Sequence, residues 1–300
     1  MGPPERAGAL AARRDRRSRA ARRLNSLPIG VFDSGVGGLT VLRALTEALP
    51  QERFIYLGDT ARLPYGTKSA DTVVRYALQA TDQLIERGIK CLVVACNTAS
   101  AAALPAIRAR HPELPEVGVV DPGARAAVAA SRSGRIAVIA TEATVRGGAY
   151  QAAITRLRPQ AQVQSLACQL FVALAEEGWS EGAVAQAVAR RYLDPLFDVP
   201  SPPDTLVLGC THFPALLPAI RSVLGQSIAI VDSASTTAAV MRELLAQRAL
   251  GCVDSQPREA ASPLPRVQFL ATDGTARFAA VGSRFLGRGI DERDVTLIDL

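Results

Sequence analysis

Short apolar runs alternate with longer stretches rich in alanine and leucine along most of the chain. Each run is about five residues long and lacks the alternation of apolar and polar residues that marks a strand with one wet face. Continuous apolar strands separated by helices are typical of parallel sheets covered on both faces. The pattern therefore predicts a doubly wound α/β fold. The predicted strands are Ile29 to Phe32, Phe54 to Leu57, Cys91 to Ala95, Val117 to Val120, Ile136 to Ile139, Val163 to Leu166, Thr205 to Leu208 and Ile228 to Val231.

Two of the predicted strand-helix units resemble each other. The sequence LVVA precedes Cys96 and LVLG precedes Cys210, and both cysteines are followed by LPAIR. Cysteine and proline are nine residues apart in the first unit and eight in the second, so a gap of one residue aligns them. The match indicates two similar α/β halves. Ligands bind at the carboxyl ends of parallel strands, so we expect the active site in the cleft between the halves.

The candidate junctions between the halves follow the last strand of each set. One is the turn Asp121-Pro122-Gly123, and the other lies near Asp232. We expect residues 122–232 to form the second domain, and residues 28–121 plus 233–300 to form a discontinuous first domain. Beyond Asp232 the pattern predicts a helix from 236 to 250, a proline-rich loop from 256 to 265, a strand from 267 to 271 and a helix from 275 to 286.

The formal charge of +6 is confined to the first 27 residues, which hold eight arginines against two acidic residues. The rest of the chain has 26 basic and 26 acidic residues, so the body offers no general footprint for nucleic acid. We expect residues 1–27 to be a disordered Arg-rich tail. A transit peptide and an anion or nucleic-acid contact are the alternatives for this segment. It lacks the apolar core of a secretory signal, and no stretch of the chain is apolar enough to span a membrane.

The chain has five cysteines, an odd number, and no CxxC or HExxH spacing. An odd count without a secretory signal argues against a disulfide framework, and the missing spacings argue against a structural metal. We therefore expect reduced thiols, no metal and a cytoplasmic location.

Cys96 and Cys210 stand apart because each lies where a strand gives way to a helix. Amide groups at a helix N-terminus stabilise an anion, so we expect these thiol pKa values to fall from about 8.5 toward neutral. The alternative is a small buried apolar residue, which is what most cysteines are. Two cysteines in equivalent places favour a functional role. The three others, Cys91, Cys168 and Cys252, lack this context and are interpreted as structural.

Polar residues follow other predicted strands. A glycine-rich turn runs from Asp33 to Leu39, but Thr40 replaces the last glycine of a dinucleotide fingerprint and no GK[ST] is present, so the turn favours a small anion. The loop 59–67 is rich in donors, although a plain surface loop explains it equally well. His212 follows Cys210 by two residues and could act as its proton partner.

Four motifs in this order resemble those of bacterial glutamate racemases, within the aspartate/glutamate racemase superfamily. They are FDSGVGGLTVL, GDTARLPYG, VVACNTAS and LGCTHFPAL, and the similarity extends from Pro28 to about Leu286. The resemblance implies four catalytic residues, namely Cys96, Cys210, Asp33 and His212. It implies a substrate site made of Asp33, Ser34, Tyr65, Gly66, Asn97, Thr98, Thr211 and His212.

The chain departs from the family pattern at a few positions. Gln169 and Ala173 stand where members usually have proline, ahead of the acidic pair at 176 and 177, which puts a supporting role of Glu176 in doubt. Asp121 replaces a more usual glutamate.

The resemblance also implies a reaction and its setting. Racemisation removes an α-proton from one face of the substrate and returns one to the other, which two thiols can do without a cofactor. The product would be D-glutamate for peptidoglycan and hence cell-wall synthesis, and the enzyme a homodimer. Two alternatives stay open: an aspartate or hydantoin racemase of the same superfamily, and a redox-active thiol or binding protein.

Overall fold

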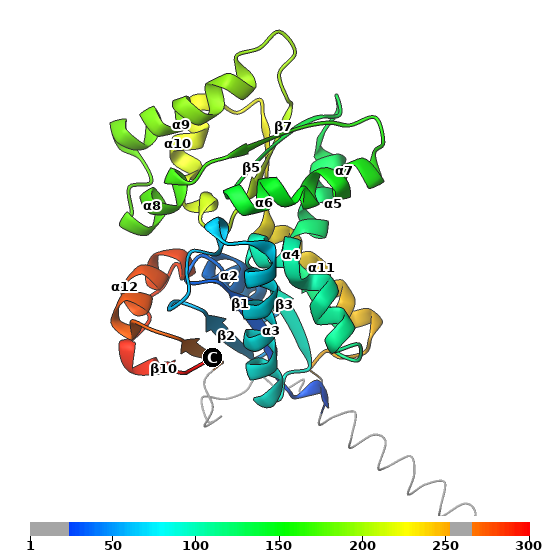
Figure 1. Cartoon of the computed structure of the whole chain (residues 1–300), viewed down its shortest axis with the longest axis vertical. Helices are drawn as coiled ribbons and strands as arrows, with labels where there is room; N and C mark the ends of the chain where they lie inside the picture. Colours follow the sequence, from blue (N-terminus) through cyan, green and yellow to red (C-terminus); the bar gives the residue numbers. More distant parts are fainter. Residues whose placement is uncertain (1–23, 253–265) are drawn as a thin grey trace, which may run out of the picture.

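The computed structural model describes residues 24–252 and 266–300, which form two parallel sheets, one above the other (Figure 1). The doubly wound α/β prediction is confirmed. The first sheet has the order β10-β9-β2-β1-β3-β4 and the second the order β6-β5-β7-β8. The first sheet is built from β1 (Ile29–Asp33), β2 (Phe54–Gly58), β3 (Cys91–Val94), β4 (Glu116–Gly118), β9 (Val267–Ala271) and β10 (Val295–Leu297). The second is built from β5 (Arg135–Ala140), β6 (Gln162–Ala167), β7 (Thr205–Gly209) and β8 (Ala229–Asp232).

Helices connect the strands and cover the sheets. In chain order they are α2 (Leu39–Ala48), α3 (Ala70–Glu86), α4 (Asn97–Arg110), α5 (Val120–Ala130), α6 (Glu142–Gly147), α7 (Ala149–Leu157), α8 (Leu170–Glu177), α9 (Gly182–Phe197), α10 (Leu217–Leu224), α11 (Ser233–Gln247) and α12 (Thr275–Leu286). Three short 3-10 helices are η1 (Tyr65–Thr67), η2 (Phe213–Leu216) and η3 (Glu292–Asp294). None of the helices in the described ranges is both long and apolar enough to cross a bilayer.

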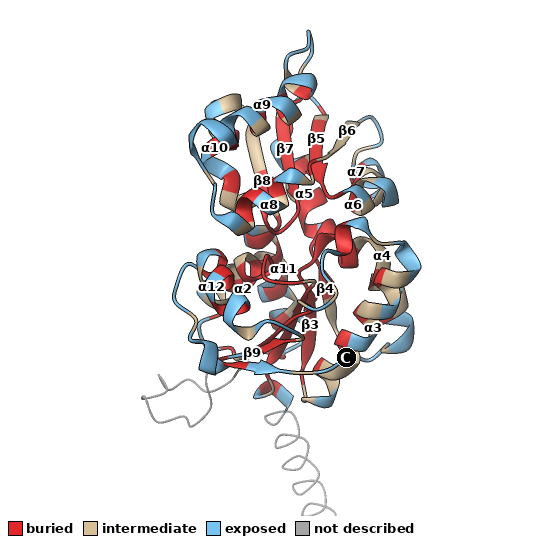
Figure 2. Ribbon diagram, turned by 60° about the vertical axis from the view of Figure 1, so that its left-hand side comes forward, coloured by how far each residue is buried: buried red, intermediate tan, exposed pale blue. Residues whose placement is uncertain are grey.

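The central strands are buried on both faces because their side chains alternate between two apolar layers. On β2, Phe54 and Tyr56 belong to one buried cluster, while Ile55 and Leu57 belong to another. Successive side chains of a strand point to opposite faces, so a continuous apolar run requires cover on both sides. We call each sheet with the helices that cover it a unit, the first unit holding the six-stranded sheet and the second the four-stranded sheet. Figure 2 shows a buried centre in both units, with exposed residues on the outer helices.

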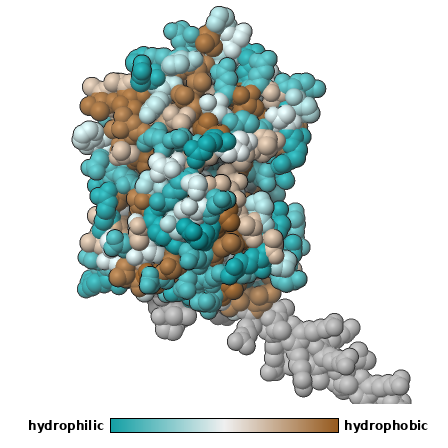
Figure 3. Space-filling model, viewed as in Figure 1, coloured by the Kyte–Doolittle hydropathy of each residue, from teal (hydrophilic) through white to brown (hydrophobic). Residues whose placement is uncertain are grey.

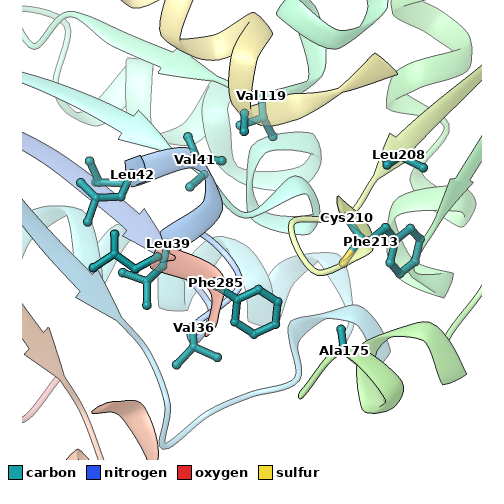
Figure 4. Close-up of a cluster of buried hydrophobic side chains, with 14 of the residues drawn as sticks. Val36, Leu39, Val41, Leu42, Val119, Ala175, Leu208, Cys210, Phe213 and Phe285 are labelled. Atoms are coloured by element: carbon teal, nitrogen blue, oxygen red, sulfur yellow. The ribbon is translucent and has the colours of Figure 1, made fainter. Parts of the chain in front are cut away.

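The larger of these clusters is continuous across the two units. It joins Val31 and Leu42 of the first unit to Leu208 and Phe213 of the second. Figure 4 shows part of this cluster, with side chains from both units in one group. The outer surface is different in character, since Figure 3 shows apolar side chains scattered among polar ones over one face of the molecule. An apolar contact between the units restricts their relative motion.

The first sheet gains two strands from the C-terminal part of the chain. β9 pairs with β2, and β10 pairs with β9, so the chain returns to the first unit as the sequence suggested. The strand Val295–Leu297 was not anticipated, because three residues are too short to give a periodic signal. The domain boundaries given above stay a prediction.

Two local predictions need correction. Asp121-Pro122-Gly123 lies inside the first turns of α5 and is not a turn between domains; proline is tolerated there because first-turn amides have no helical partner. The helix predicted from 236 to 250 is α11, which begins at Ser233. The Asp232 side chain caps it by accepting hydrogen bonds from the amides of Ala234 and Ser235. The predicted loop from 256 to 265 lies outside the described residues.

The end of the predicted tail also differs from expectation. Residues 1–23 lie outside the described ranges, but Asn25 is buried and donates from Nδ2 to the Ala249 carbonyl at 3.0 Å. Its own carbonyl accepts from Lys90 Nζ at 2.8 Å, and the same ammonium donates to Glu52 at 2.6 Å and to the Leu250 carbonyl at 2.8 Å. A buried ammonium needs this number of partners. Residues 24–27 therefore belong to the folded body.

Candidate active site

A cavity of about 350 Å³ lies between the two units, at the carboxyl ends of their strands. Both thiols line it, together with seven of the eight predicted substrate residues. Its walls are Ser34, Leu63, Pro64, Tyr65, Gly66, Thr67, Cys96, Asn97, Thr98, Thr141, Gln169, Val172, Ala173, Glu176, Cys210, Thr211 and His212. Asp33 is the predicted residue absent from the wall, since it is fully buried one position behind Ser34.

Cys96 is the N-cap of α4. Its sulfur accepts from the Ala99 amide at 3.4 Å and donates to the Ser34 hydroxyl at 3.4 Å. Burial, and then the charge of Asp33, raise its pKa to about 12, although the two hydrogen bonds act in the opposite direction. The predicted capping position is thus observed, but the expected lowering of the pKa is wrong for Cys96, because desolvation of a buried thiolate outweighs the helix N-terminus.

Cys210 follows β7 but does not cap an α-helix. A turn and the short helix η2 separate it from α10. Its sulfur instead lies 3.8 Å from Nδ1 of His212. The expectation of a helix N-terminus at both thiols is therefore wrong for Cys210, whose sulfur contacts an imidazole instead.

His212 is buried and has a partner on each ring nitrogen. Nε2 lies 3.2 Å from a Glu176 carboxylate oxygen, on the side opposite Cys210. Burial works against the charged ring, but Cys210 and Glu176 outweigh it and raise the pKa of His212 to about 10. The hydrogen bond from His212, more than any other cause, lowers the pKa of Glu176. The pair therefore places positive charge beside the Cys210 sulfur.

Asp33 ends β1, beneath the glycine-rich turn. One carboxylate oxygen accepts from the Gly35 amide at 2.9 Å, and the other has no hydrogen-bond partner among the described residues. Burial raises the pKa of this carboxyl, although the charge of His212 and the backbone amides of the turn oppose the rise. A buried carboxyl with a free oxygen is suited to exchanging a proton or to receiving a cationic group.

The glycine-rich turn is needed for close approach between the units. A Cβ atom on Gly37 would lie 2.5 Å from both the His212 ring and the Thr211 hydroxyl. The Thr40 hydroxyl adds a bond to the Thr211 carbonyl at 3.2 Å. The turn therefore presses directly against the residues that follow Cys210, which is a role the sequence did not reveal.

Tyr65 and Gly66 form the wall beside the second unit. The Tyr65 hydroxyl donates to Asp59, which also accepts from Arg62 at 2.6 Å. The Tyr65 hydroxyl is therefore already engaged, and its ring packs against Phe32 and Tyr76 in the core of the first unit. A Cβ on Gly66 would meet the Thr141 side chain at 2.7 Å, so glycine permits this contact between the units.

Sequence reasoning missed Thr141, Thr144 and Tyr150, which contact the predicted residues Thr98 and Asn97. The hydroxyls of Thr98, Thr141 and Thr144 form a triangle with sides of 2.9 to 3.0 Å. The Tyr150 hydroxyl donates to Asn97 Oδ1 at 2.7 Å, and Asn97 Nδ2 has no partner among the described residues. The available signal for Thr141 was its position directly after β5, since Cys96 and Asp33 also lie at the carboxyl ends of strands.

Within residues 24–252 and 266–300, no group of three or more His, Cys, Asp or Glu side chains is arranged to hold a metal ion. All five thiols of the chain are free.

Comparison with known proteins identifies the family. A sequence model of the Asp/Glu/Hydantoin racemase family matches residues 29–241. The chain is 50% identical over 259 residues to the glutamate racemase of Geobacter metallireducens, covering 86% of this chain and 92% of the relative. The structure of Francisella tularensis glutamate racemase in complex with D-glutamate is similar with a TM-score of 0.82 at 33% identity, over 92% of this chain and 98% of that one. The Thermus thermophilus glutamate racemase structure, in complex with β-chloro-D-alanine, gives a TM-score of 0.78 at 41% identity, over 92% and 98% of the two chains. The chain therefore belongs to the Asp/Glu/hydantoin racemase family, and within it to the glutamate racemases.

Proposed function

We propose that the cavity between the units binds glutamate and that Cys96 and Cys210 interconvert its enantiomers without a cofactor. The observation that carries this proposal is that the two thiols come from equivalent places in two similar units and line one cavity. Deprotonation of one face of Cα and reprotonation of the other requires a base and an acid on opposite sides. Two units facing each other across a cavity provide such opposite sides.

The neighbours of each thiol suggest how the protons move. A thiolate at Cys210 takes the α-proton of one enantiomer while Cys96 donates from the other side, and the roles exchange for the opposite enantiomer. His212 supplies a positive charge 3.8 Å from the Cys210 sulfur. The Cys96 sulfur lies 3.4 Å from the Ser34 hydroxyl and the Ala99 amide, which stabilise its anion when it forms.

Two buried polar atoms without partners in the described chain suggest how the amino acid is held. Asp33 offers a free carboxylate oxygen, which suits an ammonium group, and Asn97 offers a free amide N–H, which suits a carboxylate. The hydroxyls of Thr98 and Thr141 provide further donors on the same side as Asn97. This arrangement supports recognition of an α-amino acid.

Circular dichroism of L-glutamate incubated with the purified protein tests the activity. The proposal expects the signal to decay to zero, and to decay from the opposite sign with D-glutamate. Aspartate and a hydantoin measured alongside test the alternative substrates of the family. Faster conversion of either would replace glutamate in the proposal. A reversible disulfide between Cys96 and Cys210 without racemisation would instead support the redox alternative.

The homodimer and the cytoplasmic location remain expectations from the sequence. For the homodimer, light scattering should give twice the chain mass of 31.6 kDa. A monomer mass at micromolar concentration would contradict the dimer.

A further inference from the structure

One face of α12 contacts both residues that lie behind the Cys210 thiol. Arg277 donates to a Glu176 carboxylate oxygen at 3.1 Å, and Arg284 donates to the backbone carbonyl of the same residue. The Phe285 ring packs against the His212 ring at a centroid distance of 5.1 Å and an angle of 75°. Residues seven and eight positions apart lie on one face of a helix, so these three contacts form a single surface.

This surface belongs to the first unit, whereas Glu176 and His212 belong to the second. Phe278 anchors α12 on the first sheet, with its ring 5.9 Å from that of Tyr56 and 6.1 Å from that of Phe269. Figure 4 shows Phe285 projecting from this helix toward the turn that carries Cys210. A helix fixed in one unit therefore contacts the proton partner of the thiol in the other.

Glu176 is held at both of its carboxylate oxygens. Oε1 faces His212 and Oε2 faces Arg277, so the plane of the carboxylate is set by two partners on opposite sides. The Arg277 side chain is 64% exposed and does not line the active-site cavity. Arg277 therefore reaches the residues beside the Cys210 thiol through Glu176.

We propose that Arg277 and Phe285 are positioning residues that fix the His212 ring beside Cys210. The proposal rests on the two-thiol racemisation proposed above. Arg277 directs the Glu176 carboxylate at Nε2 of His212, and Phe285 packs against the ring and limits its tilt. The Cys96 thiol has no contact with α12 in this scheme. The consequence is a helix that supports one of the two thiols and leaves the other unaffected.

The test needs a reaction that reports each thiol separately, because racemisation uses both. A glutamate analogue with chlorine on Cβ serves as the probe, in each configuration at Cα. A thiolate removes the α-proton, the electron pair of the C–H bond forms a C=C bond, and chloride leaves. The resulting enamine hydrolyses to 2-oxoglutarate and ammonia. Only one base is required, and Cys96→Ser and Cys210→Ser identify which configuration reports which thiol.

Arg277→Gln should slow the elimination that depends on Cys210 by roughly fivefold, the scale of a partly exposed ion pair. It should leave the elimination that depends on Cys96 unchanged. Phe285→Leu keeps an apolar side chain but removes the ring contact, and should act selectively in the same direction by about the same factor. Arg277→Lys should recover part of the rate. Arg156→Gln is the matched control, since Arg156 is 65% exposed and pairs with Asp121 on the surface of the second unit.

The His212→Asn background provides a second criterion. If Arg277 acts through His212, adding Arg277→Gln should not slow the residual Cys210-dependent elimination any further. Equal slowing of both eliminations, or a further loss in the His212→Asn background, overturns the positioning role. If instead the two cysteine variants fail to separate the two configurations of the probe, the two-thiol function is wrong and the positioning proposal falls with it.

Discussion

The two thiols occupy matching places in the two units, yet their surroundings are different. Cys96 caps an α-helix and has a hydroxyl and an amide as neighbours, with the carboxyl of Asp33 as the main nearby charge. Cys210 precedes a short 3-10 helix and has a histidine that a carboxylate supports. A repeated fold element thus brings both sulfurs to one cavity, while the different side chains around each sulfur decide how it holds its proton.

Replacing the thiols themselves tests whether both halves are needed. Either Cys96→Ser or Cys210→Ser should lower the racemisation rate by about 10³-fold, because a positioned acid or base contributes on this scale and a hydroxyl is a far weaker acid than a thiol. Circular dichroism measures the rate, and calorimetric titration should still detect glutamate binding. Cys252→Ser is the control, as Cys252 lies outside the cavity. Near-normal activity in either of the first two variants would contradict the account.

Gly37→Ala should disturb His212 beside Cys210, although Gly37 lies in the first unit and His212 in the second. The added methyl group would lie 2.5 Å from the His212 ring and must displace it. A shift of about 1 Å in a catalytic group costs roughly 10²-fold in kcat. Gly35→Ala is a matched control in the same turn, because its Cβ would meet only Leu63, at 3.4 Å. Equal rates in the two variants would show that His212 need not be held closely.

Glu176→Gln should alter the pH dependence of the Cys210 half. Glu176 is one of the partners that raise the pKa of His212 to about 10. The neutral amide removes this contribution, so the imidazolium loses its proton at lower pH. The alkaline limb of the profile of kcat against pH should move to lower pH, with a decrease in kcat of about tenfold. The adjacent, exposed Glu177→Gln should leave the profile unchanged, and an unmoved profile in Glu176→Gln would separate His212 from this carboxylate.

Thr141→Val should have the smallest effect and should act on substrate binding. The substitution keeps the shape of the side chain but removes one corner of the hydroxyl triangle beside Thr98. The loss of one hydrogen bond is worth about 1 kcal/mol, or roughly fivefold in glutamate affinity if the triangle orients the Thr98 hydroxyl. The Michaelis constant should rise while the pH profile stays unchanged. A changed profile would assign Thr141 to proton transfer.

The sequence predicts most of the fold because the signal for buried strands is local. The eight apolar runs match observed strands within a few residues at each end, and the two cysteines fall at strand ends as expected. β10 was not predicted because it is only three residues long and is defined by its pairing with β9. Pro122 led to a wrong prediction of a turn, because proline is common both in turns and in the first turn of a helix.

The site was harder to predict where contacts cross between units. Glu176 contacts His212, which is 36 positions away in the sequence, and Arg277, which is 101 positions away. Hydrophobic periodicity does not predict side-chain contacts between residues so far apart. The expected activation of Cys96 by its helix was wrong because burial, which the sequence does not quantify, has the larger effect on the thiol pKa. The sequence predicts that Cys96 caps a helix, but the thiol pKa depends on the balance between desolvation and hydrogen bonding, which only the three-dimensional structure shows.

The claim that one thiol serves each face of the substrate is tested most directly by proton exchange during the first turnovers. L-glutamate is incubated with the enzyme in D2O, and mass spectrometry follows deuterium in the two separated enantiomers. The account predicts that newly formed D-glutamate carries deuterium at Cα from the start, because the thiol on the far face delivers a solvent-derived proton, while the remaining L-glutamate carries none. Early D-glutamate that retains the original α-proton would mean that a single group acts on both faces, and would contradict the division of labour between Cys96 and Cys210.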